Sequence, residues 1–147
     1  VYSSPMLRAK QTAQAYTALS GHALQFHEGI VEFDRHTSSY IPMEELKLTN
    51  YAAWTAFAAG RCHEEVDILA FQDTVVRALE SIIGRHQGQR VAVFCHGGVI
   101  NVWVAHVLKM VPRLFFEPFY TSINRFLCAR SGERNVVSLN ETGHLRS

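Results

Sequence analysis

The chain has 147 residues, a net charge of +1 and 48% hydrophobic side chains, which fits one globular domain with a hydrophobic core. No basic run points to nucleic acid, no apolar run is long enough for a membrane span, and we recognise no signal peptide. Three cysteines without framework spacing predict free thiols and a cytoplasmic protein. We therefore expect neither nucleic acid nor a membrane as partner.

The start of the chain predicts the end of a strand followed by a helix. Val1-Tyr2 is apolar, Ser4 is predicted to cap the helix, and Pro5 suits its first position. Arg8 opposes the helix dipole there, so it either extends into water or holds an anion together with the serine hydroxyls. The predicted inward face of this helix consists of Ala9, Thr12, Ala13, Tyr16 and Leu19, and the helix ends at Ser20-Gly21.

The next segment contains a candidate general acid. Ala23–Phe26 is predicted as a short strand, and Glu32 follows between apolar neighbours within Glu28–Phe33. A carboxylate in such a setting suits a general acid, although a solvated loop glutamate is the plainer interpretation. Residues 34–60 carry several aromatic side chains and are predicted to form a small inserted cap, which either selects the substrate or packs on the body.

The middle of the chain predicts a helix, a buried strand and a second helix. Asp67–His86 has the apolar spacing of an amphipathic helix. Val91–Cys95 is apolar and β-branched, as expected of a strand that is buried on both faces of a parallel sheet. The turn His96-Gly97-Gly98 leads into the apolar helix Val99–Leu108. Its backbone N–H groups and the histidine are placed to bind an anion.

A Gly-Gly turn alone can be simple punctuation between a strand and a helix. Here it matches the turn at Ser4–Arg8, and an open α/β sheet brings such turns to the carboxyl ends of parallel strands, where these folds bind ligands. We therefore predict one shared anion site. Cys95 is predicted to be an inert core thiol, and the His and Cys residues do not have the spacing of a metal site. We expect no cofactor.

The last part of the chain predicts a β-hairpin. Ile123–Ala129 and Asn135–Leu139 have strand composition, and Ser131-Gly132 supplies the turn between them. Asn140–His144 is predicted to close the chain as a polar loop.

The opening segment Tyr2-Ser-Ser-Pro-Met-Leu-Arg-Ala-Lys-Gln-Thr-Ala13 resembles the S-S-P-x-x-R-A-x-Q-T-A segment of the histidine phosphatase superfamily, also called the phosphoglycerate mutase-like family. Val93–Asn101 resembles the second histidine motif of that family, and Ser138–Leu145 is similar to its C-terminal stretch. The resemblance covers nearly the whole chain. It implies an α/β fold, a three-layer α/β/α sandwich with a mostly parallel sheet, and phosphoryl transfer through a phosphohistidine without metal.

The resemblance also implies roles for particular residues. Arg8 would clamp the phosphate, because its planar guanidinium suits phosphoryl oxygens. His96 would stabilise charge on the transferring group, and Glu32 would protonate the leaving alcohol and activate the attacking water. Ser4 and the Gly97 N–H would add hydrogen bonds to the substrate. No metal ligand is implied.

Two points of the resemblance stay open. Glu28 lies close to Glu32 and is an alternative proton donor. The nucleophilic histidine of the family belongs to an Arg-His-Gly motif, which this chain does not contain. Arg35-His36 is followed by Thr37, and Arg85-His86 by Gln87. We therefore expect an N-terminally incomplete single domain over residues 1–147, without its first strand and inactive by itself.

For the complete protein the expected function is hydrolysis of a phosphomonoester through a phosphohistidine, with a small phosphorylated metabolite or inorganic phosphate as ligand. The short cap segment favours hydrolysis over the related mutase reaction. Phosphoglycerate mutase-type transfer and a pseudo-phosphatase that only binds phosphate are the alternatives, and a purely structural domain is a third class. The sequence does not predict the oligomeric state.

Overall fold

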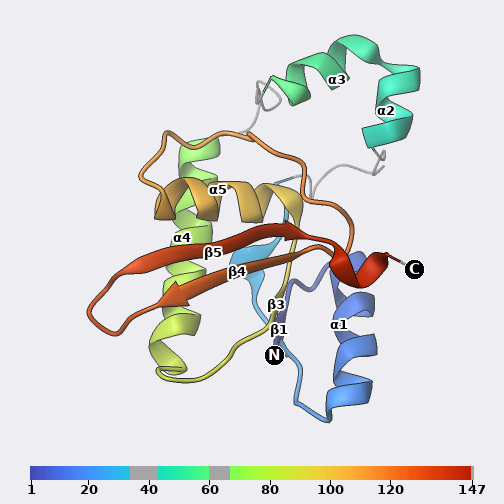
Figure 1. Cartoon of the computed structure of the whole chain (residues 1–147). Coiled ribbons are helices and arrows are strands. Elements are labelled where there is room, and N and C mark those ends of the chain that lie inside the picture. Colours follow the sequence, from blue (N-terminus) through green and yellow to red (C-terminus); the bar gives the residue numbers. More distant parts are fainter. Residues whose placement is uncertain (34–42, 60–66, 147) are drawn as a thin grey trace.

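A computed structural model describes residues 1–33, 43–59 and 67–146 of the chain (Figure 1). In chain order the elements are β1 (Tyr2–Ser3), α1 (Leu7–Ser20), β2 (Gln25–Phe26), η1 (Glu28–Ile30), α2 (Met43–Thr49), α3 (Tyr51–Ala58), α4 (Ile68–Arg85), β3 (Val93–Phe94), α5 (Gly97–Val107), β4 (Ile123–Cys128), β5 (Arg134–Glu141) and η2 (Gly143–Leu145). The predicted mixed α/β class is confirmed.

Three short parallel strands form a sheet with β1 in the middle, in the order β2-β1-β3. Tyr2 pairs with Gln25 on one side and with Val93 on the other. The prediction that Val91–Cys95 is buried on both faces is wrong, because only Val93–Phe94 is strand and its side chains are half-buried. β3 is an edge strand of this sheet, which explains the exposure.

The sheet lies between α1 on one face and α4 with α5 on the other. Neighbouring side chains of a strand point to opposite faces. The Phe94 ring accordingly packs on Tyr16 of α1, with 5.6 Å between the ring centroids. Val93 packs into the core on the other side. This core brings together residues of η1, α4 and α5: Ile30, Val75, Ala78, Val99, Val102, Trp103 and Val107. The predicted layers with a parallel sheet are therefore present.

Helix α1 begins later than its sequence predicts. Leu7 is its first residue and the extended Met6 precedes it without a side-chain cap, whereas Ser4 directs its hydroxyl elsewhere. Only Ala9 and Ala13 of the predicted inward face are buried, and Leu19 is 92% exposed. The strands that α1 packs against have only two residues each, so only the smallest side chains of this helix are buried.

Helix α4 confirms the predicted amphipathic helix. The Asp67 side chain caps it by accepting hydrogen bonds from the N–H groups of Leu69 and Ala70. His86 follows its last turn, as predicted, and its Nε2 lies 2.9 Å from the Tyr2 hydroxyl. This contact ties the end of α4 to the central strand, so His86 has a structural place.

Strands β4 and β5 form the predicted antiparallel hairpin, and β5 runs alongside α5 (Figure 1). Phe126 and Val136 pack from it onto the core. The predicted polar closing loop is partly wrong, because β5 continues to Glu141 and η2 follows at Gly143–Leu145. No helix in residues 1–33, 43–59 and 67–146 is long and apolar enough to cross a membrane.

Helices α2 and α3 fall within the predicted cap. Trp54 of α3 stacks on Tyr51, with centroids 5.4 Å apart, and the Lys47 ammonium of α2 lies 4.7 Å from the Trp54 ring centroid. Residues 34–42 and 60 of the predicted cap, including His36, lie outside the described residues. The role of the cap and the single-domain assignment stay predictions.

Candidate functional site

The carboxyl ends of β1 and β3 bring the predicted half-sites together. The strands are parallel neighbours, and the Ser4 N–H continues their ladder by donating to the Phe94 carbonyl at 2.9 Å. The turn after β1 leads to Arg8 in the first turn of α1, and the turn after β3 leads to His96 at the start of α5. Parallel strands end at the same edge of a sheet, which explains why residues so distant in sequence meet.

His96 is the centre of this group and is only 6% exposed. Its Nε2 lies 2.8 Å from the Ser4 hydroxyl oxygen, which also accepts the Met6 N–H at 3.3 Å. Its Nδ1 accepts a hydrogen bond from Arg8 Nε at 3.3 Å. The guanidinium and the imidazole therefore face each other, an arrangement suited to holding a phosphoryl group between donors.

Glu32 reaches the same site from the segment that follows η1. Its side chain is buried, and its Oε2 accepts the Gly98 N–H at 2.8 Å at the start of α5. Its Oε1 accepts the N–H of Phe33 at 3.1 Å. A carboxylate is favoured at a helix N-terminus because the backbone donors there have no partners within the helix. Glu32 is thus held at Gly98, which lies two positions after His96 in the chain.

Gly98 has a steric reason to be glycine. A Cβ at this position would overlap Glu32 Oε1 and would lie 2.6 Å from the ring of Phe33. At the neighbouring Gly97 a Cβ would meet only Pro118 at 3.7 Å, an ordinary contact. The sequence predicted the Gly97 N–H as a ligand donor. The position that sterically requires glycine, however, is Gly98.

A cavity of about 270 Å³ is lined by Pro5, Met6, Glu28 and Val31. Pro5 and Met6 directly follow Ser4 in the chain, whereas Ser4, Arg8 and His96 do not line the cavity. Glu28, the alternative proton donor, is exposed at this cavity, whereas the carboxylate of Glu32 is buried against α5.

Cys95 immediately precedes His96 but is not equipped as a nucleophile. Burial raises the pKa of its thiol to about 12, and the negative charge of Glu32 adds to this effect. Its side chain packs against the hydrophobic core. The reactive form of cysteine is the thiolate, so the structure agrees with the prediction of an inert thiol.

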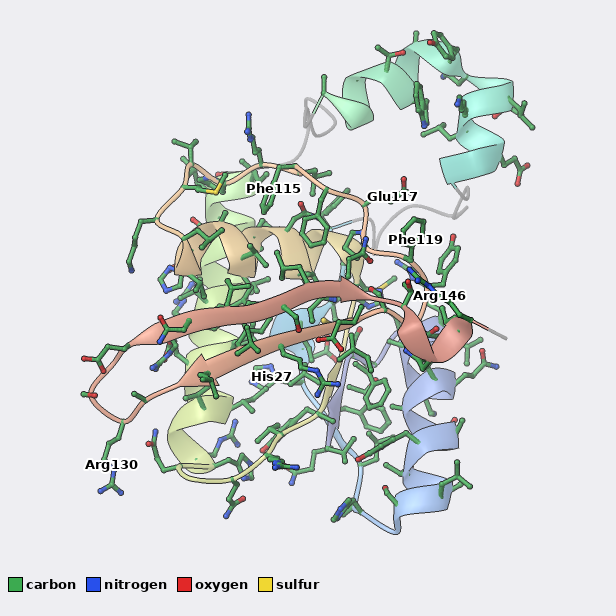
Figure 2. All side chains as sticks on the ribbon, in the orientation of Figure 1. His27, Phe115, Glu117, Phe119, Arg130 and Arg146 are labelled. Atoms are coloured by element: carbon green, nitrogen blue, oxygen red, sulfur yellow. The ribbon has the colours of Figure 1, made fainter. Side chains whose placement is uncertain are left out.

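Asn101 is a buried residue that the sequence analysis did not identify as part of the site. Its Nδ2 donates to the carbonyls of Gly97 and Phe116, and its Oδ1 accepts the N–H groups of Phe115 and Phe116. It therefore ties the first turn of α5 to the segment that passes over this helix, where Figure 2 labels Phe115, Glu117 and Phe119. The available signal was a polar side chain in the middle of a helix that is otherwise apolar except for His106 near its end.

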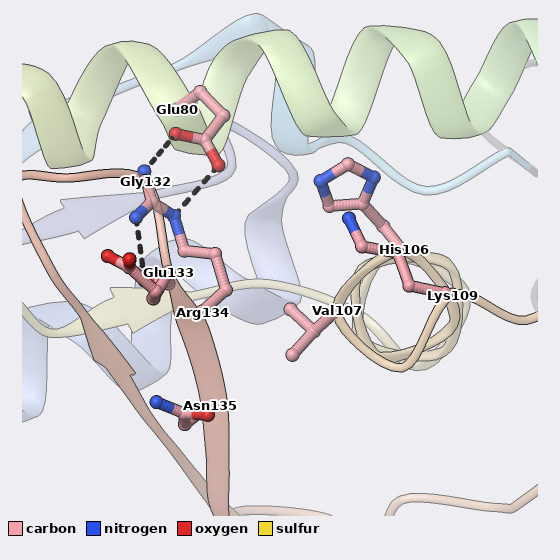
Figure 3. A pocket seen from close by; sticks show the side chains of 8 residues that line it. All are labelled: Glu80, His106, Val107, Lys109, Gly132, Glu133, Arg134 and Asn135. Atoms are coloured by element: carbon pink, nitrogen blue, oxygen red, sulfur yellow. Dashed lines mark hydrogen bonds and ion pairs between the residues drawn. The ribbon is translucent and has the colours of Figure 1, made fainter.

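A second cavity of about 290 Å³ lies at the other end of α5, between that helix, α4 and the hairpin (Figure 3). One of the cations that line this cavity, Arg134, is paired with Glu80. Its Nε donates to Glu80 Oε1 at 2.9 Å, and its Nη2 donates to Oε2 at 2.5 Å. Burial and the charge of Lys109 lower the pKa of His106 at its rim. In the described parts of the chain no three His, Cys, Asp or Glu side chains are grouped to hold a metal ion.

Comparison with known proteins adds to this geometry. The sequence profile of the histidine phosphatase superfamily (branch 1) matches residues 1–142. Phosphoglycerate mutase-like protein 4 of Arabidopsis thaliana is 27% identical over 161 residues, which covers 100% of this chain and 69% of that protein.

Solved structures share the fold. YhfR of Bacillus stearothermophilus superposes with a TM-score of 0.77 at 20% identity, over 99% of this chain and 75% of its own. The phosphoserine phosphatase of Entamoeba histolytica in complex with 3-phosphoglyceric acid superposes with a TM-score of 0.75 at 24% identity, also over 99% of this chain and 75% of its own.

Proposed function

The chain belongs to the histidine phosphatase superfamily (branch 1), and from this membership we propose that the complete protein hydrolyses small phosphomonoesters through a phosphohistidine. The observation that carries the proposal is the position of His96, with Arg8 on one ring nitrogen and Ser4 on the other. A cation and a hydrogen-bonding ring that face each other at strand ends suit an oxyanion that carries up to two negative charges.

In this proposal the residues divide the chemistry between charge and protons. Arg8 and His96 hold the phosphoryl oxygens and stabilise the charge that develops during transfer. Glu32 protonates the leaving alcohol and later activates the attacking water, since it is the carboxylate fixed at the start of α5. The Gly97 N–H, in the first turn of α5, adds a backbone donor.

The phosphoryl group passes first to a histidine of the family's Arg-His-Gly motif, which the 147 residues do not contain. We therefore propose that this chain binds phosphate but has no turnover by itself. The ligand class is a small phosphorylated metabolite. The phosphoserine phosphatase bound to 3-phosphoglyceric acid supports this class. The free thiols of Cys95 and Cys128 favour a cytoplasmic setting.

Two other functions have support of their own. The phosphoglycerate mutase-like relative favours transfer of phosphate within a sugar acid. The half-buried Arg8–His96 pair, in a chain without the nucleophile motif, favours a pseudo-phosphatase that only binds phosphate.

Hydrolysis of an aryl phosphate tests the proposal, with this chain and with a form that includes the family's Arg-His-Gly segment. We expect turnover only with that segment, and loss of turnover in the His96→Ala variant of the same form. Turnover by the 147-residue chain would refute the proposed nucleophile. If both forms are inactive while phosphate still raises the melting temperature, the pseudo-phosphatase replaces the enzyme.

A further inference from the structure

Ser4 differs from a usual ligand-binding serine because it has no exposed surface. Its hydroxyl oxygen lies 2.8 Å from Nε2 of the His96 ring, on the opposite side of the ring from Arg8. The same oxygen accepts a hydrogen bond from the Met6 N–H in the turn before α1. This position indicates that Ser4 acts on the ring of His96 rather than on a substrate.

The hydrogen bonds around His96 define where its proton lies. A guanidinium only donates, so the Nδ1 that receives Arg8 Nε–H carries a lone pair. The ring proton is then on Nε2 and is donated to the Ser4 hydroxyl. In this arrangement His96 is a neutral imidazole that cannot donate from Nδ1.

If an oxyanion binds between Arg8 and His96, Nδ1 has to donate a hydrogen bond to it, whereas in the free site Nδ1 accepts one from Arg8. The ring can take up a second proton, or it can carry its single proton on Nδ1 instead of Nε2. In the free site the positive charge of Arg8, 3.3 Å from Nδ1, disfavours a second positive charge on the ring, so the first route requires proton uptake when the anion binds. The second route needs a partner at Nε2 that donates as readily as it accepts.

The Ser4 hydroxyl is such a partner, because it has one donor and two acceptor positions. We infer that Ser4 reverses its hydrogen bond with His96 when an oxyanion displaces Arg8 from Nδ1. One proton leaves Nε2 and one is gained at Nδ1, while the Ser4 hydroxyl keeps its own proton and rotates to donate to Nε2. Ser4 is thus a positioning residue that lets neutral His96 donate to the anion. This inference rests on the proposed function.

The tautomer of His96 can be read directly from ¹⁵N chemical shifts of the imidazole nitrogens in long-range ¹H–¹⁵N NMR spectra, assigned with the His96→Gln variant. Sulfate serves as the probe because it keeps its charge at neutral pH, so that any proton taken up belongs to the protein. We expect a protonated Nε2 in the free protein and a protonated Nδ1 with sulfate. Calorimetry in buffers of different ionisation enthalpy should show no proton uptake.

Ser4→Ala and Ser3→Ala form a matched pair of variants. Both serines are fully buried, and the Ser3 hydroxyl donates only to the carbonyl of Ser4 at 2.8 Å. We expect Ser4→Ala to weaken sulfate binding about tenfold and to change the His96 imidazole shifts, because the ring loses a net hydrogen bond. Ser3→Ala should leave both unchanged.

The outcomes separate this inference from the proposed function. If no resonance of the site responds to sulfate, the anion site itself is wrong, and the inference falls with it. If sulfate binds but His96 keeps its proton on Nε2, or if binding takes up one proton, the inference alone is refuted. Equal effects of the two serine variants on sulfate affinity would also refute it, since burial rather than the ring contact would then be the cause.

Discussion

Replacement of Gly98 by alanine tests whether the start of α5 holds Glu32 as described. The added Cβ would overlap Glu32 Oε1 and crowd the ring of Phe33, so the carboxylate has to leave the Gly98 N–H. Both the stability of the chain and the geometry of the site depend on this contact.

The expected magnitude follows from three effects. Loss of a charge-assisted hydrogen bond lowers the free energy of unfolding by about 1.5–3 kcal/mol. Overpacking against Phe33 lowers it by about 1–3 kcal/mol. The higher helix propensity of alanine returns about 1 kcal/mol. The net loss is about 3 kcal/mol, which lowers the melting temperature of a domain of this size by roughly 6–12 °C.

The assay is thermal unfolding followed by circular dichroism, with Gly84→Ala as the matched control. Gly84 is an exposed glycine of α4, and apart from its chain neighbours and the backbone of its own helix nothing lies within 4 Å of its ideal Cβ position. Gly84→Ala should raise the unfolding free energy by about 1 kcal/mol through helix propensity alone. If Gly98→Ala melts at or above the wild-type temperature, as the control should, the contact between Glu32 and α5 is refuted.

Because burial raises the pKa of Cys95 to about 12, iodoacetamide should modify it on the order of a thousandfold more slowly at pH 8 than an exposed thiol. Rapid labelling of Cys95 in the folded chain, measured by mass spectrometry, would contradict its burial. The free energy of unfolding should decrease as the pH rises above 9.0, because the thiol ionises in the unfolded chain first. Arg134→Met should lower the free energy of unfolding by about 1–2 kcal/mol in urea titrations, since the Arg134 side chain is only 12% exposed and is paired with Glu80. The control is Arg77→Met, because the Arg77 side chain is 73% exposed; this variant should change the free energy of unfolding by less than about 0.5 kcal/mol. Equal effects would show that burial of the ion pair is irrelevant. Asn101→Ala should lower it by about 3 kcal/mol because half-buried N–H and C=O groups of the loop and of α5 lose their partners; a change below about 0.5 kcal/mol would argue against that role.

The sequence predicted the meeting of the half-sites because it depends only on order and direction of strands. Ser4 and His96 each follow a strand and precede a helix, and parallel strands place such turns at one edge of the sheet. The long helix α4 was equally predictable, since its apolar spacing and the Asp67 cap are local signals. The comparisons now support the fold on independent grounds.

The features that the sequence did not predict are set by tertiary contacts. Ser4 resembles a helix cap, but its hydroxyl is occupied by His96, a partner that lies far along the chain. The demand for glycine at position 98 exists only because Glu32 arrives there from another segment. Asn101 bonds a segment that returns over α5, which no periodicity within that helix indicates.

The most direct test of the central claim is the affinity of this chain for inorganic phosphate, measured by isothermal titration calorimetry in the wild type, Arg8→Met and Arg90→Met. Arg90 is exposed and lies before β3, so its replacement removes the same charge outside the site. We expect Arg8→Met to raise the Kd at least about tenfold, from the loss of a charge-assisted hydrogen bond, and Arg90→Met to leave it unchanged. Equal losses in both variants, or no phosphate binding by the wild type, would contradict an anion site built by Arg8 and His96.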